Sequence, residues 1–190
     1  YAQPAMPAGV HDDILRGMYR LQKRPDAQVQ LLGSGTILRE AIAAAELLEK
    51  DFAITANVWS VTSWSELRRD GMTCARHNRL NPDASPRISH VEAQLSGQHG
   101  PVIAASDHVT AVPDLIRAYV PQPYVTLGTD GYGRSDTREN LRRFFEMDRH
   151  HIVVAALAAL ADEGEIDRAK VAAAISRYGI AAKAAAPWES

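Results

Sequence analysis

The chain has 190 residues, of which 46% are hydrophobic and 23% charged, so it is long enough for one ordinary domain with a real core and too apolar to be disordered throughout. Its 21 basic and 23 acidic residues give a net charge of −2, which offers no global reason to expect a nucleic acid or an anionic membrane as partner. The single cysteine, Cys74, excludes an internal disulfide, so the fold needs no oxidising compartment.

The first half of the chain is expected to alternate helices and strands. Apolar residues fall at helical spacing between residues 12 and 21, with acidic residues first and basic residues last, which suits the helix dipole. A short apolar strand follows, then a strongly periodic helix, and then a stretch rich in β-branched and aromatic residues that favours a second strand. The expected elements are a helix at 12–21, a strand at 29–32, a helix at 37–50, a strand at 52–61, and a helix capped by Ser63 or Ser65.

The second half continues the alternation and closes with helices. We expect a loop at 76–87, a short helix at 88–95, a strand at 102–105, a helix at 113–118, a strand at 120–127, and helices at about 136–145, 149–163 and 167–178, with Gly164 and Gly179 at C-terminal caps. This order predicts one α/β domain around a mostly parallel sheet. The predicted organisation is a lead-in or linker at 1–10, the domain at 11–180 and a C-terminal tail at 181–190.

Targeting and membrane signals are not visible. No basic segment followed by an apolar run opens the chain, so no secretory signal is expected. The longest uncharged apolar run, residues 152–161, is about half of the roughly 20 residues needed to cross a bilayer and predicts a buried helix. The chain begins at Tyr1 rather than Met, which suggests a processed chain or a piece of a longer one.

Two glycines surround a serine at the turn between the first strand and the next helix. Backbone amides at Gly33-Ser34-Gly35 could hold an anion. A dinucleotide-binding fingerprint would need a glycine where Leu38 stands and an acid at the end of the second strand, which reads Trp59-Ser60. A nucleophile elbow at Ser34 would need a glycine at position 32. A tight turn is favoured, and a regulatory small-anion site is the alternative.

The stretch from Thr129 to Asp136 is the most unusual in the chain. Gly131 and Gly133 allow backbone angles that other residues avoid, and Asp136 with Glu139 has capping-box spacing. A shaped turn before a strong helix start is favoured over a ligand or interface loop. The arginines that follow are interleaved with acids, which predicts a solvated, salt-bridged face, with docking of an acidic partner as the alternative; these arginines are Arg134, Arg138, Arg142, Arg143 and Arg149.

No catalytic or metal constellation emerges from the remaining residues. The seven histidines lack the spacing of a zinc site, and no second cysteine supports one. Asp107-His108 follows a strand and could do acid–base work, but no nucleophile accompanies the pair. Taken alone, these residues predict an α/β domain without an assembled active site.

Several stretches resemble the C-terminal region of the homodimeric bacterial pyruvate dehydrogenase E1 family. The most specific is Leu127-Gly128-Thr129-Asp130-Gly131-Tyr132-Gly133-Arg134-Ser135-Asp136, which continues into Arg138-Glu139-Asn140-Leu141. Others are Gln30-Leu31-Leu32-Gly33-Ser34-Gly35, Val58-Trp59-Ser60-Val61-Thr62-Ser63-Trp64, Glu66-Leu67-Arg68-Arg69-Asp70-Gly71 and Val153-Val154-Ala155-Ala156-Leu157. The resemblance runs from the first residue to about Gly179.

The resemblance implies a transketolase C-terminal-like fold, a three-layer α/β domain with a mixed, mainly parallel sheet of about five strands. It also implies that thiamin diphosphate and Mg²⁺ bind other domains of a cytoplasmic homodimer, so no catalytic, cofactor-binding or metal-binding residue is assigned here. The implied partners are the remaining E1 domains, the second E1 subunit and the E2 dihydrolipoyl acetyltransferase, with no nucleic acid and no membrane. The candidate interface residues are Asp130, Tyr132, Arg134, Asp136, Arg138 and Arg142.

Overall fold

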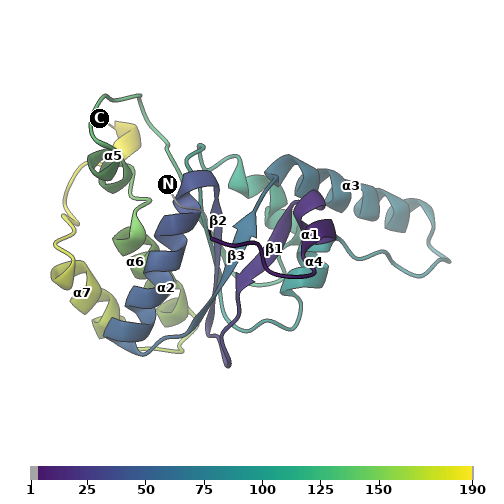
Figure 1. Ribbon diagram of the computed structural model, residues 1–190, viewed down its shortest axis with the longest axis horizontal. Helices are drawn as coiled ribbons and strands as arrows, with labels where there is room; N and C mark the ends of the chain where they lie inside the picture. Colours follow the sequence, from purple (N-terminus) through teal and green to yellow (C-terminus); the bar gives the residue numbers. More distant parts are fainter. Residues whose placement is uncertain (1–3, 190) are drawn as a thin grey trace.

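The computed structural model describes residues 4–189, which fold around one five-stranded sheet (Figure 1). The strands are β1 (Met18–Gln22), β2 (Val29–Ser34), β3 (Ala56–Val61), β4 (Val102–Ala105) and β5 (Tyr124–Leu127). Their order is β1-β3-β2-β4-β5, with β3, β2, β4 and β5 parallel and β1 antiparallel along the edge of β3. The mixed, mainly parallel sheet predicted for this α/β domain is confirmed.

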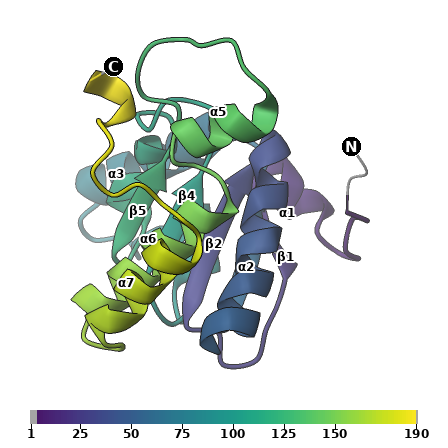
Figure 2. The same cartoon turned by 90° about the vertical axis from the view of Figure 1, so that its left-hand side faces the viewer.

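Helices cover both faces of the sheet, which gives three layers (Figures 1 and 2). The α-helices are α1 (His11–Leu15), α2 (Leu38–Phe52), α3 (Trp64–Leu80), α4 (His90–Leu95), α5 (Arg138–Phe144), α6 (Arg149–Asp162) and α7 (Arg168–Arg177), and the 3-10 helices are η1 (Gly35–Ile37), η2 (Pro113–Tyr119) and η3 (Pro187–Glu189). On one face α2, α6 and α7 enclose an aliphatic core. On the other face α3, α4 and η2 enclose a core that contains Trp59 and Trp64.

Strand β2 divides these two cores because successive side chains of a strand point to opposite faces. All six of its residues are buried, as expected of a central parallel strand. Leu31 contributes to the aliphatic core and Leu32 to the core with the tryptophans, and neither is exposed to solvent. The sheet is therefore shared by two cores, one on each of its faces.

The predicted helix at 12–21 is wrong. A five-residue helix, α1, ends at Leu15, and Gly17 has a φ of 107°, a backbone angle that few residues other than glycine adopt. The chain then runs as β1, in which Met18 lies opposite Val61. Antiparallel pairing with β3 at the edge of the sheet, rather than the helical spacing of the apolar residues, decides the structure of this segment.

Smaller boundary errors have local causes. The strand expected at 52–61 starts at Ala56, because α2 continues to Phe52 and ends on Ala53 in the left-handed conformation. The strand expected at 120–127 starts at Tyr124, after the two prolines, and the helix expected at 113–118 is the 3-10 helix η2. Part of the loop expected at 76–87 is helical, because α3 extends to Leu80.

The two ends of the chain were predicted as a lead-in and a tail. Residues 1–3 and 190 lie outside the described part of the chain, and the domain boundaries stay predictions. Within residues 181–189, Pro187 is buried, and a Cβ on Gly131 would lie 2.4 Å from its carbonyl oxygen. The segment that follows α7 therefore packs against the loop after β5. None of the described helices is long and apolar enough to cross a membrane.

Candidate functional site

The loop from Thr129 to Asp136 leaves the carboxyl end of β5 and leads to α5, where the sequence placed the candidate interface. Its first residues are anchored to the segment that follows β4: the Thr129 amide donates to the His108 carbonyl over 3.0 Å, and an Asp130 carboxylate oxygen accepts from the Thr110 amide over 3.0 Å. A Cβ on Gly128 would lie 2.5 Å from the carbonyl oxygen of His108, so the two segments touch through their backbones. The base of the loop is therefore fixed to the sheet.

The tip of the loop presents an aromatic side chain to solvent. Tyr132 is 77% exposed, and Gly131, with a φ of 126°, lies against the Pro187 carbonyl. Trp188, the residue after this proline, is 62% exposed. The two exposed aromatic residues therefore belong to segments in contact with each other. Arg134 extends over the ring of Phe144 at 4.1 Å from its centroid, which draws the end of the loop onto α5.

The start of α5 differs from the expected capping box. The capping residue is Thr137, whose hydroxyl accepts from the Asn140 amide over 3.3 Å, whereas Asp136 precedes the cap. The Asp136 carboxylate accepts from the Thr137 amide over 2.6 Å and from the Asn140 side chain over 2.8 Å. These hydrogen bonds, and then the nearby Arg134, lower the pKa of the Asp136 carboxyl. Asp136 therefore shapes the helix start and remains exposed.

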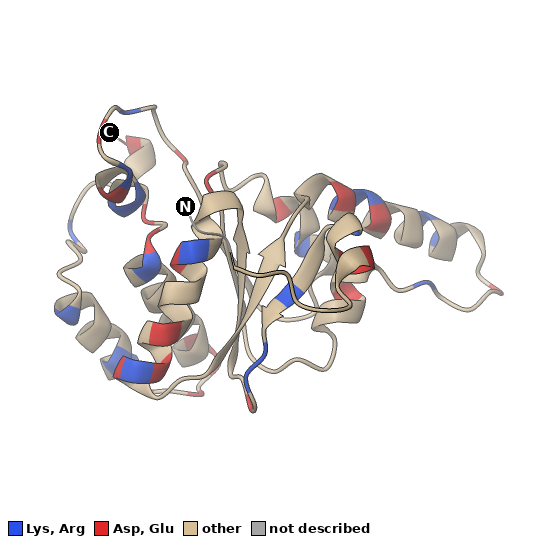
Figure 3. Ribbon diagram, viewed as in Figure 1, with Lys and Arg blue, Asp and Glu red and all other residues tan. Residues whose placement is uncertain are grey.

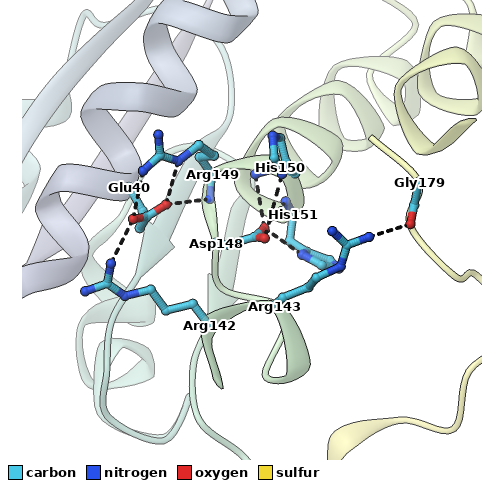
Figure 4. A network of polar contacts seen from close by, with 8 residues as sticks. All are labelled: Glu40, Arg142, Arg143, Asp148, Arg149, His150, His151 and Gly179. Carbon is cyan, nitrogen blue, oxygen red and sulfur yellow. Dashed lines mark hydrogen bonds and ion pairs between the residues drawn. The ribbon is translucent and has the colours of Figure 1, made fainter. Parts of the chain in front are cut away.

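The arginines after the loop do not form a uniform solvated face. Arg142 and Arg149 both reach Glu40 of α2, whose side chain is only 5% exposed (Figure 4). Arg142 donates to one carboxylate oxygen over 2.9 Å, and Arg149 donates its side chain and its backbone amide to the carboxylate, at 2.9–3.1 Å. The predicted salt-bridged character holds, but the acid involved is a buried one from α2 rather than a neighbour in sequence.

Electrostatics explain why a carboxylate is tolerated at this depth. Burial alone would raise the pKa of Glu40, but the hydrogen bonds and charge of Arg149, together with the charge of Arg142, hold it below its ordinary value. The same contacts raise the pKa of Arg149. A buried charge that accepts several charge-assisted hydrogen bonds is paired rather than stranded. Glu40, Arg142 and Arg149, which we call the Glu40 cluster, therefore join α2, α5 and the start of α6.

A second acid continues the polar network to α7. Asp148 caps α6 by accepting from the His150 and His151 amides, and it accepts from His151 Nδ1 over 2.7 Å. Burial would raise its pKa, but the contacts with His151 keep it below its ordinary value. The His150 ring stacks on Tyr178 with centroids 4.5 Å apart. Arg143 donates to the Gly179 carbonyl over 2.6 Å (Figure 4). The adjacent histidines thus both contact Asp148, and the His150 ring also contacts Tyr178.

A pocket of about 750 Å³ lies between α2, α5 and the start of α6. Its lining mixes cationic and acidic side chains around Ala43 and Leu47; the cationic ones are Lys50, Arg138, Arg142, Arg143, Arg149 and, when protonated, His150. The candidate residues therefore occupy two environments. Arg138 and Arg142 line the pocket, whereas Asp130, Tyr132, Arg134 and Asp136 lie on the loop or at its junction with α5.

The Gly33-Ser34-Gly35 turn is tight, as favoured from the sequence, and the structure gives the anion-site alternative no support. Ser34 is buried and shares a hydrogen bond of 2.9 Å with Ser106. The Asp107 carboxylate oxygens lie 3.7 Å from where a Cβ on Gly35 would stand, so an anion would meet a negative charge. Among residues 4–189, no group of three or more His, Cys, Asp or Glu side chains could hold a metal ion. Burial, followed by the charge of Asp70, raises the pKa of the Cys74 thiol.

Glu40 is the residue of this site that sequence reasoning missed. A signal was present, because Glu40 falls on the same helical face as Ile37, Ala41 and Ala44, all of which are buried. A charged residue on an otherwise apolar face predicts a buried ion pair. Its partners lie 102 and 109 positions away in sequence, so no local pattern names them.

Comparison with curated proteins finds relatives that are much longer than this chain. It is 55% identical over 184 residues to the pyruvate dehydrogenase E1 component of Pseudomonas aeruginosa and 53% identical over 184 residues to that of Cupriavidus necator, covering 95% of this chain and 21% of each relative. The Escherichia coli K12 relative is 47% identical over 183 residues, with 95% and 20% covered. The chain thus spans about a fifth of the length of these relatives.

Solved structures show the same fold at low sequence identity. Transketolase from Leishmania mexicana aligns with a TM-score of 0.56 and 19% identity over 82% of this chain and 20% of that one. Transketolase from Campylobacter jejuni aligns with a TM-score of 0.55 and 18% identity, covering 83% and 20%. A family model described as a transketolase-like TK C-terminal domain matches residues 17–148. The chain therefore belongs to the family of transketolase-like C-terminal domains.

Proposed function

We propose that this chain is the C-terminal domain of a pyruvate dehydrogenase E1 component and that its role is architectural. The identity of 53–55% over 95% of the chain to two proteins named as that component carries the proposal. The full-length protein would decarboxylate pyruvate on thiamin diphosphate and reductively acetylate the lipoyl group of E2. We expect it to be a cytoplasmic homodimer in the pathway from glycolysis to acetyl-CoA.

The described residues do not fit thiamin diphosphate or Mg²⁺ as ligands of this domain. They contain no group of three or more metal-binding side chains, and the Gly33-Ser34-Gly35 turn faces the Asp107 carboxylate. We therefore assign the cofactor and its metal to other parts of the full-length protein. Every role proposed for this chain's residues is one of packing, positioning or docking.

The loop after β5 and α5 are the proposed contact surface toward the other domains, the second subunit or E2. Tyr132 is largely exposed at the tip of a loop whose base is fixed to the sheet, which suits a rigid contact. Arg134 and Arg138 are exposed beside it. Arg142 serves this surface indirectly, because its bond to Glu40 fixes α5 against α2.

The assignment to an E1 component is tested in the gene and in the full-length protein. The reading frame around these residues should encode a continuous thiamin-dependent enzyme, and the full-length product should decarboxylate pyruvate when thiamin diphosphate and Mg²⁺ are added. The 190-residue chain alone should show no turnover under the same conditions. Pyruvate turnover by the isolated chain, or a reading frame without the other E1 domains, would refute the proposal.

The contact surface is tested by charge reversal in the full-length protein. Arg134→Glu with Arg138→Glu should weaken dimerisation, measured by sedimentation, or lower the activity of the assembled complex, measured by acetylation of the lipoyl group of E2. Lys23→Glu with Lys170→Glu changes the charge equally at two exposed residues away from the loop and serves as control. Unchanged assembly and activity in the arginine variant would remove this surface from consideration.

A further inference from the structure

Helix α3 extends beyond the part of the domain on which it packs. Its buried residues are Trp64, Leu67, Gly71 and Cys74, and none of its residues after Cys74 is buried. Figure 1 shows its outer turns and the returning segment projecting from the body, at the opposite end of the long axis from α5. Helical turns that bury no side chain gain little stability from the rest of the domain.

Polar contacts, rather than packing, brace these outer turns. The Asn78 side chain accepts from the Arg87 amide over 2.8 Å and donates to the Arg87 carbonyl over 2.9 Å, which ties the returning segment to the helix. Asn81 donates its side-chain amide to the His77 carbonyl over 2.8 Å at the end of α3. The projecting turns are therefore built as an ordered arm.

One face of this helix combines cationic and apolar side chains. The face consists of Arg68, Met72, Arg76, Arg79 and Leu80, which we call the α3 stripe. Successive members are four, four, three and one residues apart, so helical geometry places them within about 120° of one another around the helix axis. Met72 is 53% and Leu80 55% exposed.

The charge of the α3 stripe is not compensated within the domain. Its three arginines are exposed, and among the described residues no ion pair is recorded for their side chains, whereas the neighbouring Arg69 pairs with Glu66 at 2.6 Å. From Met72 to Ile88 the chain carries three arginines against one aspartate, Asp83, so the arm as a whole is basic (Figure 3).

A shallow groove of about 550 Å³ continues the stripe at its base. Arg68 and Met72 form one side, and the segment that ends in η2 forms the other with Ala111, Leu115 and Tyr119. Asp114 also lines the groove, but it pairs with Arg117 at 2.6 Å. Stripe and groove together give a continuous surface with apolar side chains among unpaired cations, which is the composition of a docking surface.

We propose that the α3 stripe docks on an acidic surface with an apolar centre that belongs to the remaining part of the full-length protein. This inference rests on the proposed function, since it assigns the partner to the E1 polypeptide. Charge complementarity selects an acidic partner, because three unpaired arginines lie on one face. The relatives supply such a partner in principle, because the chain covers about a fifth of their length.

Hydrogen–deuterium exchange in the full-length protein tests the docking. Amides of residues 75–80 should exchange at least tenfold more slowly than those of a solvent-exposed helix end, and Arg68→Glu/Arg76→Glu/Arg79→Glu should remove that protection. Lys23→Glu/Lys170→Glu/Lys183→Glu, which changes the charge equally at exposed residues off the stripe, should leave it unchanged. A photo-crosslinker at position 80 should capture an acidic peptide from outside these 190 residues.

The outcomes separate this inference from the proposed function. A full-length protein that decarboxylates pyruvate normally but leaves residues 75–80 unprotected would overturn the docking and leave the function intact. A crosslink to a second copy of this domain would overturn the assigned partner. If the triple variant misfolds, Arg76→Gln/Arg79→Gln is a milder change that removes two of the three charges. Raised salt screens the remaining charge, so amides of residues 75–80 that stay fully protected in this variant at raised salt would also contradict the docking.

Discussion

Glu40 shows how a single side chain can organise a surface. Its carboxylate is buried and accepts hydrogen bonds from Arg142 of α5 and from Arg149 at the start of α6. All three residues line the pocket between α2, α5 and α6. Removing one partner of a buried ion pair lowers the stability of a protein more than replacing the whole pair with apolar residues does, because the remaining charge is left buried without a partner. The docking surface proposed around α5 therefore depends on a residue whose own side chain is only 5% exposed.

Glu40→Gln should lower the free energy of unfolding by about 3 kcal/mol at neutral pH, the low end for a buried pair because Arg149 is 45% exposed. Urea unfolding followed by circular dichroism measures the change. Glu46→Gln, on the same helix but exposed and without a recorded ion pair, is the matched control and should change stability by less than about 0.5 kcal/mol. Equal effects of the two substitutions would show that burial of the Glu40 charge is not what matters.

Acid should destabilise the protein through the same carboxyl groups. The folded pKa values of Glu40 and Asp148 lie below their ordinary values of 4.5 and 3.8, so their contribution is complete above those values and is lost as the pH falls through the folded pKa values. The Glu40→Gln variant lacks part of this dependence, so its stability should fall less steeply between about pH 5 and pH 3. Urea unfolding at several pH values measures both slopes, and parallel slopes would contradict the assignment.

At the scale of elements, the alternation of helices and strands was readable from the sequence because the central strands are short apolar runs between turn residues and α2 carries a clear helical period. Strands β2, β3 and β4 and helices α2, α6 and α7 all appeared close to their predicted places. Strand β1 was missed because five residues on a sheet edge fit a helical pattern as well as a strand pattern; Gly17, inside the supposed helix, was the available warning.

The turn from β2 to α2 should be intolerant of any side chain at Gly33. A Cβ there would lie 2.6 Å from the Leu38 Cα and 3.2 Å from the Ala41 Cβ, so the helix would have to move away from the sheet. Gly33→Ala should destabilise the protein by about 2 kcal/mol in urea unfolding. Gly133→Ala, where no atom lies within 4 Å of the added carbon, should be nearly neutral. A neutral Gly33→Ala would mean that the close approach of strand and helix is adjustable.

At the scale of the whole molecule, two cores share one sheet, so they should unfold together. Leu31→Ala and Leu32→Ala open cavities on opposite faces of β2, and each should lower stability by about 3 kcal/mol. Fluorescence of Trp59 and Trp64 reports the core that contains Leu32. Leu31→Ala should nonetheless shift the fluorescence and circular dichroism transitions equally. Separate transitions would show that the cores are independent.

Only part of the candidate site could be predicted from the sequence, because the rest of it forms only when the whole molecule has folded. The loop at 129–136 stood out by its local composition, whereas the Glu40 cluster unites residues that only the finished sheet brings together. The projecting part of α3 was obscured because Asn78 and Asn81 favour turns, and here they act as a brace and a C-terminal cap.

The long sequence separation within the Glu40 cluster also has a kinetic meaning. Contacts that close loops of 102 and 109 residues carry a large entropic penalty until the intervening strands have paired. We therefore expect the cluster to form late in folding and to be among the first tertiary contacts that are lost on unfolding. An interaction of this kind leaves the folding rate nearly unchanged and slows unfolding, so Glu40 acts on the lifetime of the folded domain.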